Sequence, residues 1–430
     1  MVALETLAGE IAPGPLAELR GRALARVRAA GVPTVRDEAW KYTDLRLLQD
    51  VSFATSGPAS SAPQAEPALL STCAHRLVFV DGRLERSLCR DAGLPAGVQL
   101  RSFAELQAAE PEALAALLAR YATDEAQVFS ALNAACARDG AVIDVAPGVV
   151  LDAPLLVAFL HTADAARLFS APLVIVRAAA NSSVSVLELH HGEAGAQNLA
   201  APLTHLAAAK GSRIEHWRVQ HEAGDAIHLG HLEAVVDADA RVATHAFAFG
   251  ARIARLEMVA ALEAPGASVV MNGLFNAGAG QHLDHQTRID HRAPHTTSEE
   301  LFKGLAGGDG RGVFRGQVIV RPNAQKISAR QASHNLLLSA DAEIDTKPEL
   351  EIYADDVSCA HGATVGQLDD GALFYLRSRG VPEAEARALL VFGFTQEVVE
   401  QVAFAPLRGW LAEQLAGRAD VPLPSVEDLA

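Results

Sequence analysis

The residues best suited to bind a metal are Cys359 and His361, which lie two positions apart in a segment with the texture of a β-strand. Side chains at positions i and i+2 of a strand project to the same face. A thiolate and an imidazole placed side by side can ligate one iron or zinc ion. Because two ligands do not complete a tetrahedral site, the others would come from another chain or from the sulfides of a cluster.

The same pair permits two other interpretations. A cysteine next to a histidine can act as a nucleophile with its base, but no partner that would orient the imidazole can be assigned from the sequence. A lone Cys-x-His is also, more often than not, purely structural. The other cysteines, Cys73, Cys89 and Cys136, form no Cys-x-x-Cys pair, so free thiols are expected.

A second candidate is the histidine-rich stretch from His282 to His295, which belongs to a region holding twelve of the sixteen histidines. Asp284 and Asp290 could orient ring N–H groups there, as they would around a metal. However, the stretch lacks the His-x-x-x-His spacing of a helical zinc site. In a strand, His282 and His285 would face opposite sides, so structural or interface histidines are the favoured interpretation.

The glycine-rich stretch from Lys303 to Gly316 raises the question of a nucleotide-binding loop. The segment is followed by a strand pattern rather than by a helix, and no Gly-x-x-x-x-Gly-Lys-Ser/Thr occurs anywhere in the chain. Turns between layers of strands explain the glycines better. The chain is therefore not expected to hydrolyse ATP itself.

Composition restricts the class of protein. The 430 residues are 50% hydrophobic and 20% charged, as in a globular protein with a large core. A net charge of -16 disfavours binding to nucleic acid and to an anionic membrane. The N-terminus lacks the features of a secretory signal, and no apolar run is long enough to span a bilayer, so a cytoplasmic location is expected.

The periodicity of the chain predicts three regions. Residues 1–140 carry helical patterns, such as Leu16, Leu19, Ala23 and Val27, and residues 371–430 are helical again. Residues 141–370 consist of short alternating or β-branched runs separated by turn residues. The C-terminal helix carries an apolar i, i+4 ladder of Ala386, Leu390, Phe394, Val398 and Val402.

A small-residue turn followed by a strand recurs in the middle region. It begins at Asn181, Gly211, Asp239 and Gly266, with steps of 30, 28 and 27 residues, and a similar form occurs at Asp341. Such a repeat favours stacked β layers in which each layer covers its neighbour. Unrelated turns in a β-sandwich are the alternative.

Several segments together resemble the signature of the SufB/SufD family of iron–sulfur cluster assembly, and specifically its SufD branch. The matching segments are Trp40-Lys41-Tyr42-Thr43, Asp284-His285, Lys303-Gly304, Asn335 to Ser339, Ala342 to Val357 with Cys359 and His361 to Gly366, and Leu373 to Gly380. They span most of the chain. Ser358 and Ala360 depart slightly from the commoner residues, but they would face away from the Cys359 and His361 side.

The resemblance implies a mainly β fold with flanking helices, namely a right-handed parallel β-helix between helical regions. It implies a scaffold, not an enzyme, that pairs with the paralogous subunit SufB and binds the ATPase SufC. A transient iron–sulfur cluster would form at the SufB–SufD interface on Cys359 and His361, with none expected on the isolated chain. A homodimer is possible when SufB is absent.

Under this interpretation, Leu390, Phe394 and Val398 would contact the ATPase through the C-terminal helices, unless they only pack on the β core. The longer SufB paralogue shares the fold and is one alternative. A β-helix enzyme acting on polysaccharides is the other, although aromatic residues make up only 5% of the chain.

Overall fold

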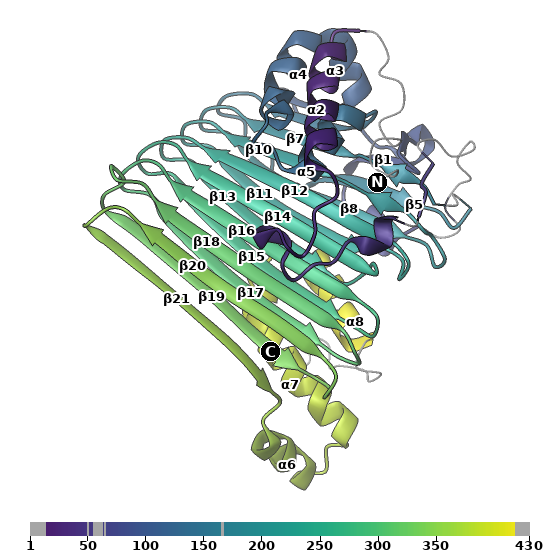
Figure 1. Cartoon of the computed structure of the whole chain (residues 1–430), viewed down its shortest axis with the longest axis vertical. Helices are drawn as coiled ribbons and strands as arrows, with labels where there is room; N and C mark the ends of the chain where they lie inside the picture. Colours follow the sequence, from purple (N-terminus) through teal and green to yellow (C-terminus); the bar gives the residue numbers. More distant parts are fainter. Residues whose placement is uncertain (1–13, 50, 55–62, 64–65, 165–166, 418–430) are drawn as a thin grey trace.

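The computed structural model describes residues 14–49, 51–54, 63, 66–164 and 167–417. Its centre is a parallel β-helix built from two sheets, with helices at both ends of the chain (Figure 1). Through most of the chain, strands alternate between the sheets, and strands of successive coils pair in parallel. Two edge strands near the N-terminus pair antiparallel with their neighbours. The expected β-helix core with flanking helices is confirmed.

The two sheets contain 10 and 11 strands, and two strands of the larger sheet lie off its main path. The first consists of β1 (His75–Val80), β2 (Arg83–Leu84), β5 (Leu155–His161), β8 (Ser183–Gly192), β11 (Arg213–His221), β13 (Arg241–Ala248), β15 (Ser268–Ala277), β17 (Thr297–Ala306), β19 (Ile327–Leu337) and β21 (Val357–Gln367). The second consists of β3 (Val98–Ser102), β4 (Gly140–Val145), β7 (Leu173–Ala178), β10 (Leu203–Ala208), β12 (Ile227–Val236), β14 (Ile253–Leu262), β16 (His282–His291), β18 (Arg311–Val320) and β20 (Glu343–Ile352), joined at one edge by β6 (Phe169–Ser170) and β9 (Leu199–Ala200).

The predicted turn repeat forms one corner of the β-helix. Asn181, Gly211, Asp239 and Gly266 all have positive φ angles, between 57 and 79 degrees. Two positions after each of them, the chain enters matching strand positions, because Arg213 pairs with Ser183 and with Arg241, and Arg241 pairs with Ser268. The series continues at His295 and Lys326, whose φ angles are also positive. Asp341, in contrast, precedes β20 and belongs to the opposite corner.

The interior of the β-helix is apolar along most of its length and closely packed. Three phenylalanines, Phe275, Phe302 and Phe314, are fully buried there. A Cβ atom added to Gly304 or Gly312 would lie 2.2 Å from the Phe275 ring. These glycines therefore make room for an aromatic ring from a neighbouring coil, which explains part of the glycine-rich segment without any nucleotide.

The helices of the N-terminal region cover the outer face of the larger sheet. They are α2 (Ala17–Ala30), α3 (Phe103–Ala109), α4 (Pro111–Leu118) and α5 (Val128–Cys136), with short 3-10 turns η1 (Glu38–Trp40), η2 (Arg46–Gln49), η3 (Ala68–Thr72), η4 (Arg86–Leu88) and η5 (Ala119–Ala122). Ser102 and Glu105 form a capping box at the start of α3. Within residues 1–140 the structure also contains β1, β2 and β3, which extend both sheets.

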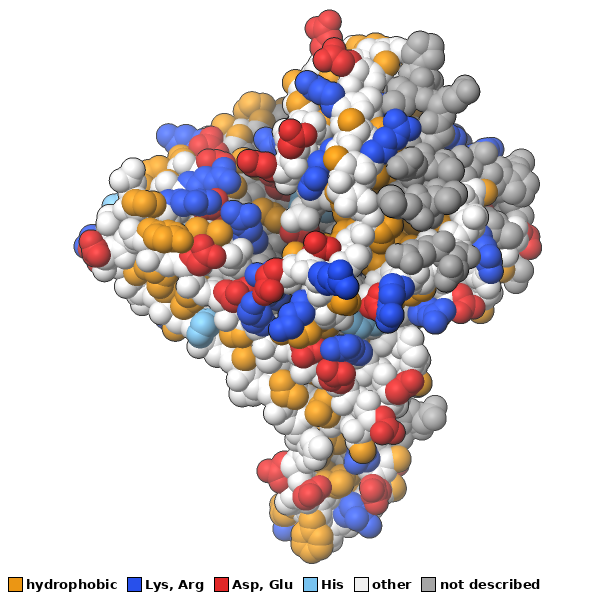
Figure 2. Space-filling model, viewed as in Figure 1, with side chains coloured by type: hydrophobic (Ala, Val, Ile, Leu, Met, Phe, Trp, Pro, Cys, Tyr) orange, Lys and Arg blue, Asp and Glu red, His pale blue; other side chains and the backbone are white. Residues whose placement is uncertain are grey.

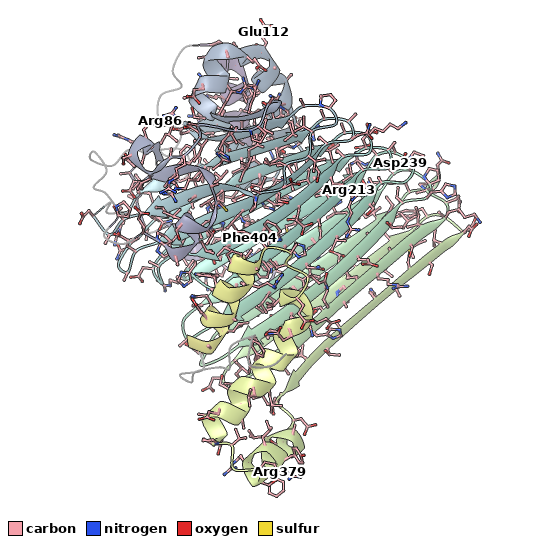
Figure 3. All side chains as sticks on the ribbon, turned by 180° about the vertical axis from the view of Figure 1, so that it is seen from behind. Arg86, Glu112, Arg213, Asp239, Arg379 and Phe404 are labelled. Carbon is pink, nitrogen blue, oxygen red and sulfur yellow. The ribbon has the colours of Figure 1, made fainter. Side chains whose placement is uncertain are left out.

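The C-terminal region consists of α6 (Asp370–Ser378), α7 (Glu383–Val399) and α8 (Ala405–Gly417). Helices α7 and α8 lie across the outer face of the smaller sheet, whereas α6 projects beyond the end of the β-helix (Figures 1 and 3). Among the described helices, none combines the length and the apolar character required to cross a membrane.

Candidate functional site

The last coil of the β-helix is open. β20 ends one sheet and β21 ends the other, so each has one hydrogen-bonded neighbour on its main sheet path. Within the described residues the outer edge of each strand has no strand paired to it. Free backbone N–H and C=O groups along such an edge can pair with a strand from another chain.

Cys359 and His361 lie on this terminal strand. Cys359 pairs with Ala329 and His361 pairs with Gln331 on β19. Ala329 and Gln331 are both buried and face the inside of the β-helix, so Cys359 and His361 share that inward side. The expected same-face arrangement is therefore present, and Ser358 and Ala360 alternate with it and are exposed.

The two candidate ligands have different surroundings. Cys359 is half-buried against a small apolar cluster that includes Val318 and Ile327. Burial raises the pKa of its thiol, and a hydrogen bond with the backbone of Ala329 offsets this only in part. His361 is exposed at the rim of the last coil. Among the described residues, no cluster of three or more His, Cys, Asp or Glu side chains could hold a metal.

The residues expected to contact an ATPase differ in accessibility. Val398 is fully buried between α7 and the smaller sheet. Phe394 is half-buried, with the Lys303 ammonium 4.5 Å from its ring centre, and Leu390 is half-buried as well. Phe394 and Val398 therefore pack on the β core in this conformation. They hold α7 in place.

Exposed apolar side chains gather at two places that the prediction did not single out. Phe374 and Tyr375 on α6 are 72% and 58% exposed. Ile352, Tyr353 and Val365 are exposed on or just after the two terminal strands. These five are most of the seven large hydrophobic residues exposed in the described structure, and hydrophobic side chains are visible along that edge and at the tip formed by α6 (Figure 2). Both places have the character of interaction surfaces.

Comparison with known proteins assigns the chain to a family. The domain described as "SUF system FeS cluster assembly, SufBD core domain" matches residues 159–394, and "SufBD protein N-terminal region" matches residues 6–157. The chain belongs to the SufBD family. The core match begins in β5 and ends in α7, so it includes the open coil with Cys359 and His361.

Two relatives of this SufBD chain cover about nine-tenths of it, and a third covers a smaller part. An iron–sulfur cluster assembly SufBD family protein from Synechocystis is 30% identical over 90% of this chain and 87% of its own length. The iron–sulfur cluster assembly protein SufD of Escherichia coli is 29% identical, covering 93% of this chain and 92% of its own. SufB of Bacillus subtilis is 27% identical over 64% of this chain and 59% of its own.

The Trp40 to Thr43 motif of the SufBD chain fastens the N-terminal segment to the β-helix. The Thr43 hydroxyl donates to Asp284 Oδ2 at 2.5 Å and lies 2.9 Å from His282 Nε2. Asp284 is fully buried and is also paired with the Arg255 guanidinium, which lies 4.0 Å from the Trp40 ring centre. The motif at Trp40 to Thr43 therefore contacts the motif at Asp284 and His285, and His282 takes part in the same contact.

Two further histidines of the rich stretch are buried, whereas His295 is exposed in a corner turn. His285 faces inward between the rings of Phe275 and Phe302, and burial lowers its pKa to about 4. His291 is buried, 2.7 Å from Thr296 Oγ1 and 2.9 Å from Ser298 Oγ. His282 and His285 lie on opposite faces, as the alternation of a strand predicts. The stretch does not form one site.

A buried polar group behind the open coil was missed by sequence reasoning. Glu300 on β17 pairs in register with Gln331, which pairs with His361, so the three form one inward-facing column. Gln331 Nε2 donates to Glu300 Oε2 at 2.6 Å, while Glu300 Oε1 and Gln331 Oε1 are buried and have no hydrogen-bond partner in the part of the chain that the structure describes. Burial raises the pKa of Glu300 to about 7.

A second buried network lies deeper in the β-helix, beyond the phenylalanines. Glu188 pairs with the Arg218 guanidinium and also lies within hydrogen-bond distance of His190 Nε2 and His216 Nε2, at 2.6 and 3.1 Å. Burial alone would raise the pKa of Glu188, but Arg218 and the imidazoles hold it well below its ordinary value. Arg218 Nη2 donates to His228 Nε2, which leaves His228 Nδ1–H to donate to Glu222 at 2.6 Å. This network is enclosed and ties adjacent coils together.

Proposed function

We propose that this chain is the SufD-type scaffold subunit of an iron–sulfur cluster assembly complex. Its open coil pairs with a SufB-type paralogue, and a nascent cluster is held between the two chains as cargo. The observation that carries the proposal is the position of Cys359 and His361, side by side on the inward face of a terminal strand. No strand of the described residues pairs with the outer edge of this strand.

A metal site shared between two chains requires that each chain supply only some of the ligands, at an edge that the other chain can reach. Two protein ligands cannot close a tetrahedral metal site, so a partner chain or the cluster's own sulfides must supply the rest. Exposed apolar residues on the same coil, Ile352, Tyr353 and Val365, give the partner a surface to bury. A second copy of this chain could use the same edge when the paralogue is absent.

The relative lengths of the matches favour the SufD branch. The match to Escherichia coli SufD runs over more than nine-tenths of both chains, whereas the match to Bacillus subtilis SufB covers about two-thirds of this one. The absence of a phosphate-binding loop from the sequence supports a non-catalytic subunit whose ATPase is a separate protein, bound through the C-terminal helices. Activity on polysaccharides has no support in these matches.

The decisive experiment expresses tagged chains with Cys359→Ser, His361→Ala or both, in cells that depend on this system for iron–sulfur clusters. Co-purification of a SufB-type paralogue and a SufC-type ATPase is measured together with iron and sulfide in the complex. We expect all variants to assemble, because the side chains are half-buried or exposed, and the double variant to lose most of the cluster.

Cys89→Ser is the matched control, because Cys89 is also a half-buried free thiol but lies beside β1, far from the open coil in sequence. It should leave cluster content unchanged. A double variant of Cys359 and His361 that assembles with both partners and retains the wild-type cluster content would eliminate the ligand role. Failure to recover either partner with the wild-type chain would eliminate the scaffold assignment.

A further inference from the structure

A large cavity lies where α7 and α8 pass over one corner of the β-helix, on the side seen in Figure 3. Its volume is about 870 Å³, within the range that proteins use for small-molecule ligands. Successive turns between the two sheets line one side, including Gly224, Arg252, Gly280 and Gly308. Helix residues line the other side, among them Ala384, Arg387, Ala388, Val391 and Leu415.

The cavity exists in part because glycine and alanine make up much of the turns beneath the helices. A Cβ atom built on Gly224 or on Gly280 would meet nothing within 4 Å. A larger residue at Gly224 would therefore fit into this space without a steric clash, and the φ angle of Gly224 is not positive. Space that is left open and is bounded by two packed elements is suited to a ligand.

The charges in the cavity are unbalanced. Arg252 is exposed and Arg387 donates Nη2 to the Leu338 carbonyl at 3.1 Å, and within the described part of the chain neither is paired with a carboxylate. The one carboxylate in the described lining is that of Asp225. In comparison, Arg315 at the open coil is paired with a glutamate at 2.6 Å. Two guanidinium groups without carboxylate partners, in a chain of net charge -16, favour an anion.

Apolar side chains complete the wall. Leu338, Leu368, Val391 and Leu415 all line the same space. We propose that the cavity between α7 and the β-helix turns binds a small organic anion, with its carboxylate, sulfonate or phosphate group at Arg252 and Arg387 and an apolar ring system against these leucines and Val391. The described lining of the site includes neither Cys359 nor His361, and the proposal does not depend on the proposed scaffold function.

The test uses 8-anilinonaphthalene-1-sulfonate, an anion on an apolar ring system, titrated into the full chain and followed by fluorescence and calorimetry. Saturable binding of one molecule per chain is expected. The neutral analogue N-phenyl-1-naphthylamine should bind about tenfold more weakly, because it lacks the group that the guanidiniums recognise. Bound probe should also raise the thermal unfolding midpoint, and above the Kd this rise should follow the logarithm of the probe concentration.

Variants locate the site. The Arg252→Ala, Arg387→Ala double variant should weaken binding by about tenfold or more. Gly224→Phe should block it by filling the cavity without backbone strain. The Arg213→Ala, Arg241→Ala double variant is the matched control, since these exposed arginines lie at the corner formed by the turn repeat, and it should leave binding unchanged.

Four results would overturn the proposal. They are equal binding of the charged and neutral probes, undiminished binding by the Arg252 and Arg387 double variant, undiminished binding by Gly224→Phe, and weak binding without saturation. Binding that emerges only after deletion of residues 418–430 would assign the cavity to the chain's own C-terminal segment and would also reject a ligand site.

Discussion

Gln331 donates a hydrogen bond of 2.6 Å to Glu300 across two neighbouring coils of the β-helix, directly behind His361. Glu300 is 3% exposed, and among the described residues its second carboxylate oxygen has no hydrogen-bond partner. A buried carboxyl group with so few donors is more stable protonated than ionised, and burial accordingly raises the pKa of Glu300 to about 7. The stability of the folded chain must then depend on pH.

Replacing Glu300 with Gln should remove this dependence. The pKa of Glu300 is about 7 in the folded chain and 4.5 as its ordinary value, so between these values the folded state binds the extra proton. Stability therefore falls as pH rises from 4.5 through 7, by about 3 kcal/mol in total. In urea unfolding at pH 5 to 8, Glu300→Gln should match the wild type at pH 5 and exceed it increasingly up to pH 8.

Glu299→Gln is the control for this comparison, since Glu299 is the exposed neighbour on the same strand. It should leave the pH dependence of the unfolding midpoint as in the wild type. If the Glu300→Gln and wild-type midpoints stay a constant distance apart from pH 5 to 8, Glu300 does not change protonation in this range.

Thr43→Ala should loosen the N-terminal segment. The Thr43 hydroxyl is one of the few donors to the fully buried Asp284 carboxylate, so its loss should destabilise the chain by about 1–3 kcal/mol. Thr43→Ser keeps the hydroxyl and should cost much less. Thermal unfolding measures the stability of the two variants, and limited proteolysis measures how firmly the N-terminal segment is held. If both variants behave alike, the hydroxyl does not contribute to stability.

Gly304→Ala tests the packing inside the β-helix. The added Cβ would lie 2.2 Å from the Phe275 ring and 2.3 Å from Asn335 Oδ1, so overpacking should cost about 1–3 kcal/mol. Gly362→Ala on the open strand has nothing within 4 Å and is the control. Combining Gly304→Ala with Phe275→Leu should be less destabilising than the sum of the two changes. Additive losses in urea unfolding would place the strain elsewhere.

The stacked architecture was predictable because the corner turns repeat with nearly constant spacing and demand positive φ. The same spacing could have found the Glu300 column, since Glu300, Gln331 and His361 follow one another at steps of 31 and 30 residues. Strand alternation alone did not reveal it, because Glu299 and Glu300 are identical residues on opposite faces. The contact between Thr43 and Asp284 spans 241 positions, and no local pattern carries such a pairing.

The C-terminal helices also show what the sequence pattern could not predict. An i, i+4 apolar ladder identifies a helix face that is buried, but not what buries it. Phe394 and Val398 pack on the smaller sheet, and Lys303 contacts both the Phe394 ring and the Glu397 carboxylate. Truncating the chain before α7 would therefore expose the hydrophobic core, and it would not be a clean test of ATPase binding. Single side chains on α6 provide a cleaner test.

Phe374→Ala combined with Tyr375→Ala should reduce binding of the SufC-type ATPase by about tenfold or more, because exposed aromatic pairs commonly dominate an interface. Both side chains are more than half exposed, so the thermal unfolding midpoint and the pairing with a SufB-type paralogue should not change. Val150→Ala, at a valine that is 61% exposed near the start of the β-helix, is the matched surface control.

Phe394→Ala separates folding from docking. Its ring packs against the core and lies 4.5 Å from Lys303 Nζ, so this variant should lower the unfolding midpoint, whatever its effect on the ATPase. If the Phe374 and Tyr375 double variant retrieves the ATPase as efficiently as the wild type, while a variant at half-buried Leu390 does not, then the docking surface lies on α7 as the sequence pattern predicted. Reduced binding in the α6 variant alone, at an unchanged unfolding midpoint, places it on α6.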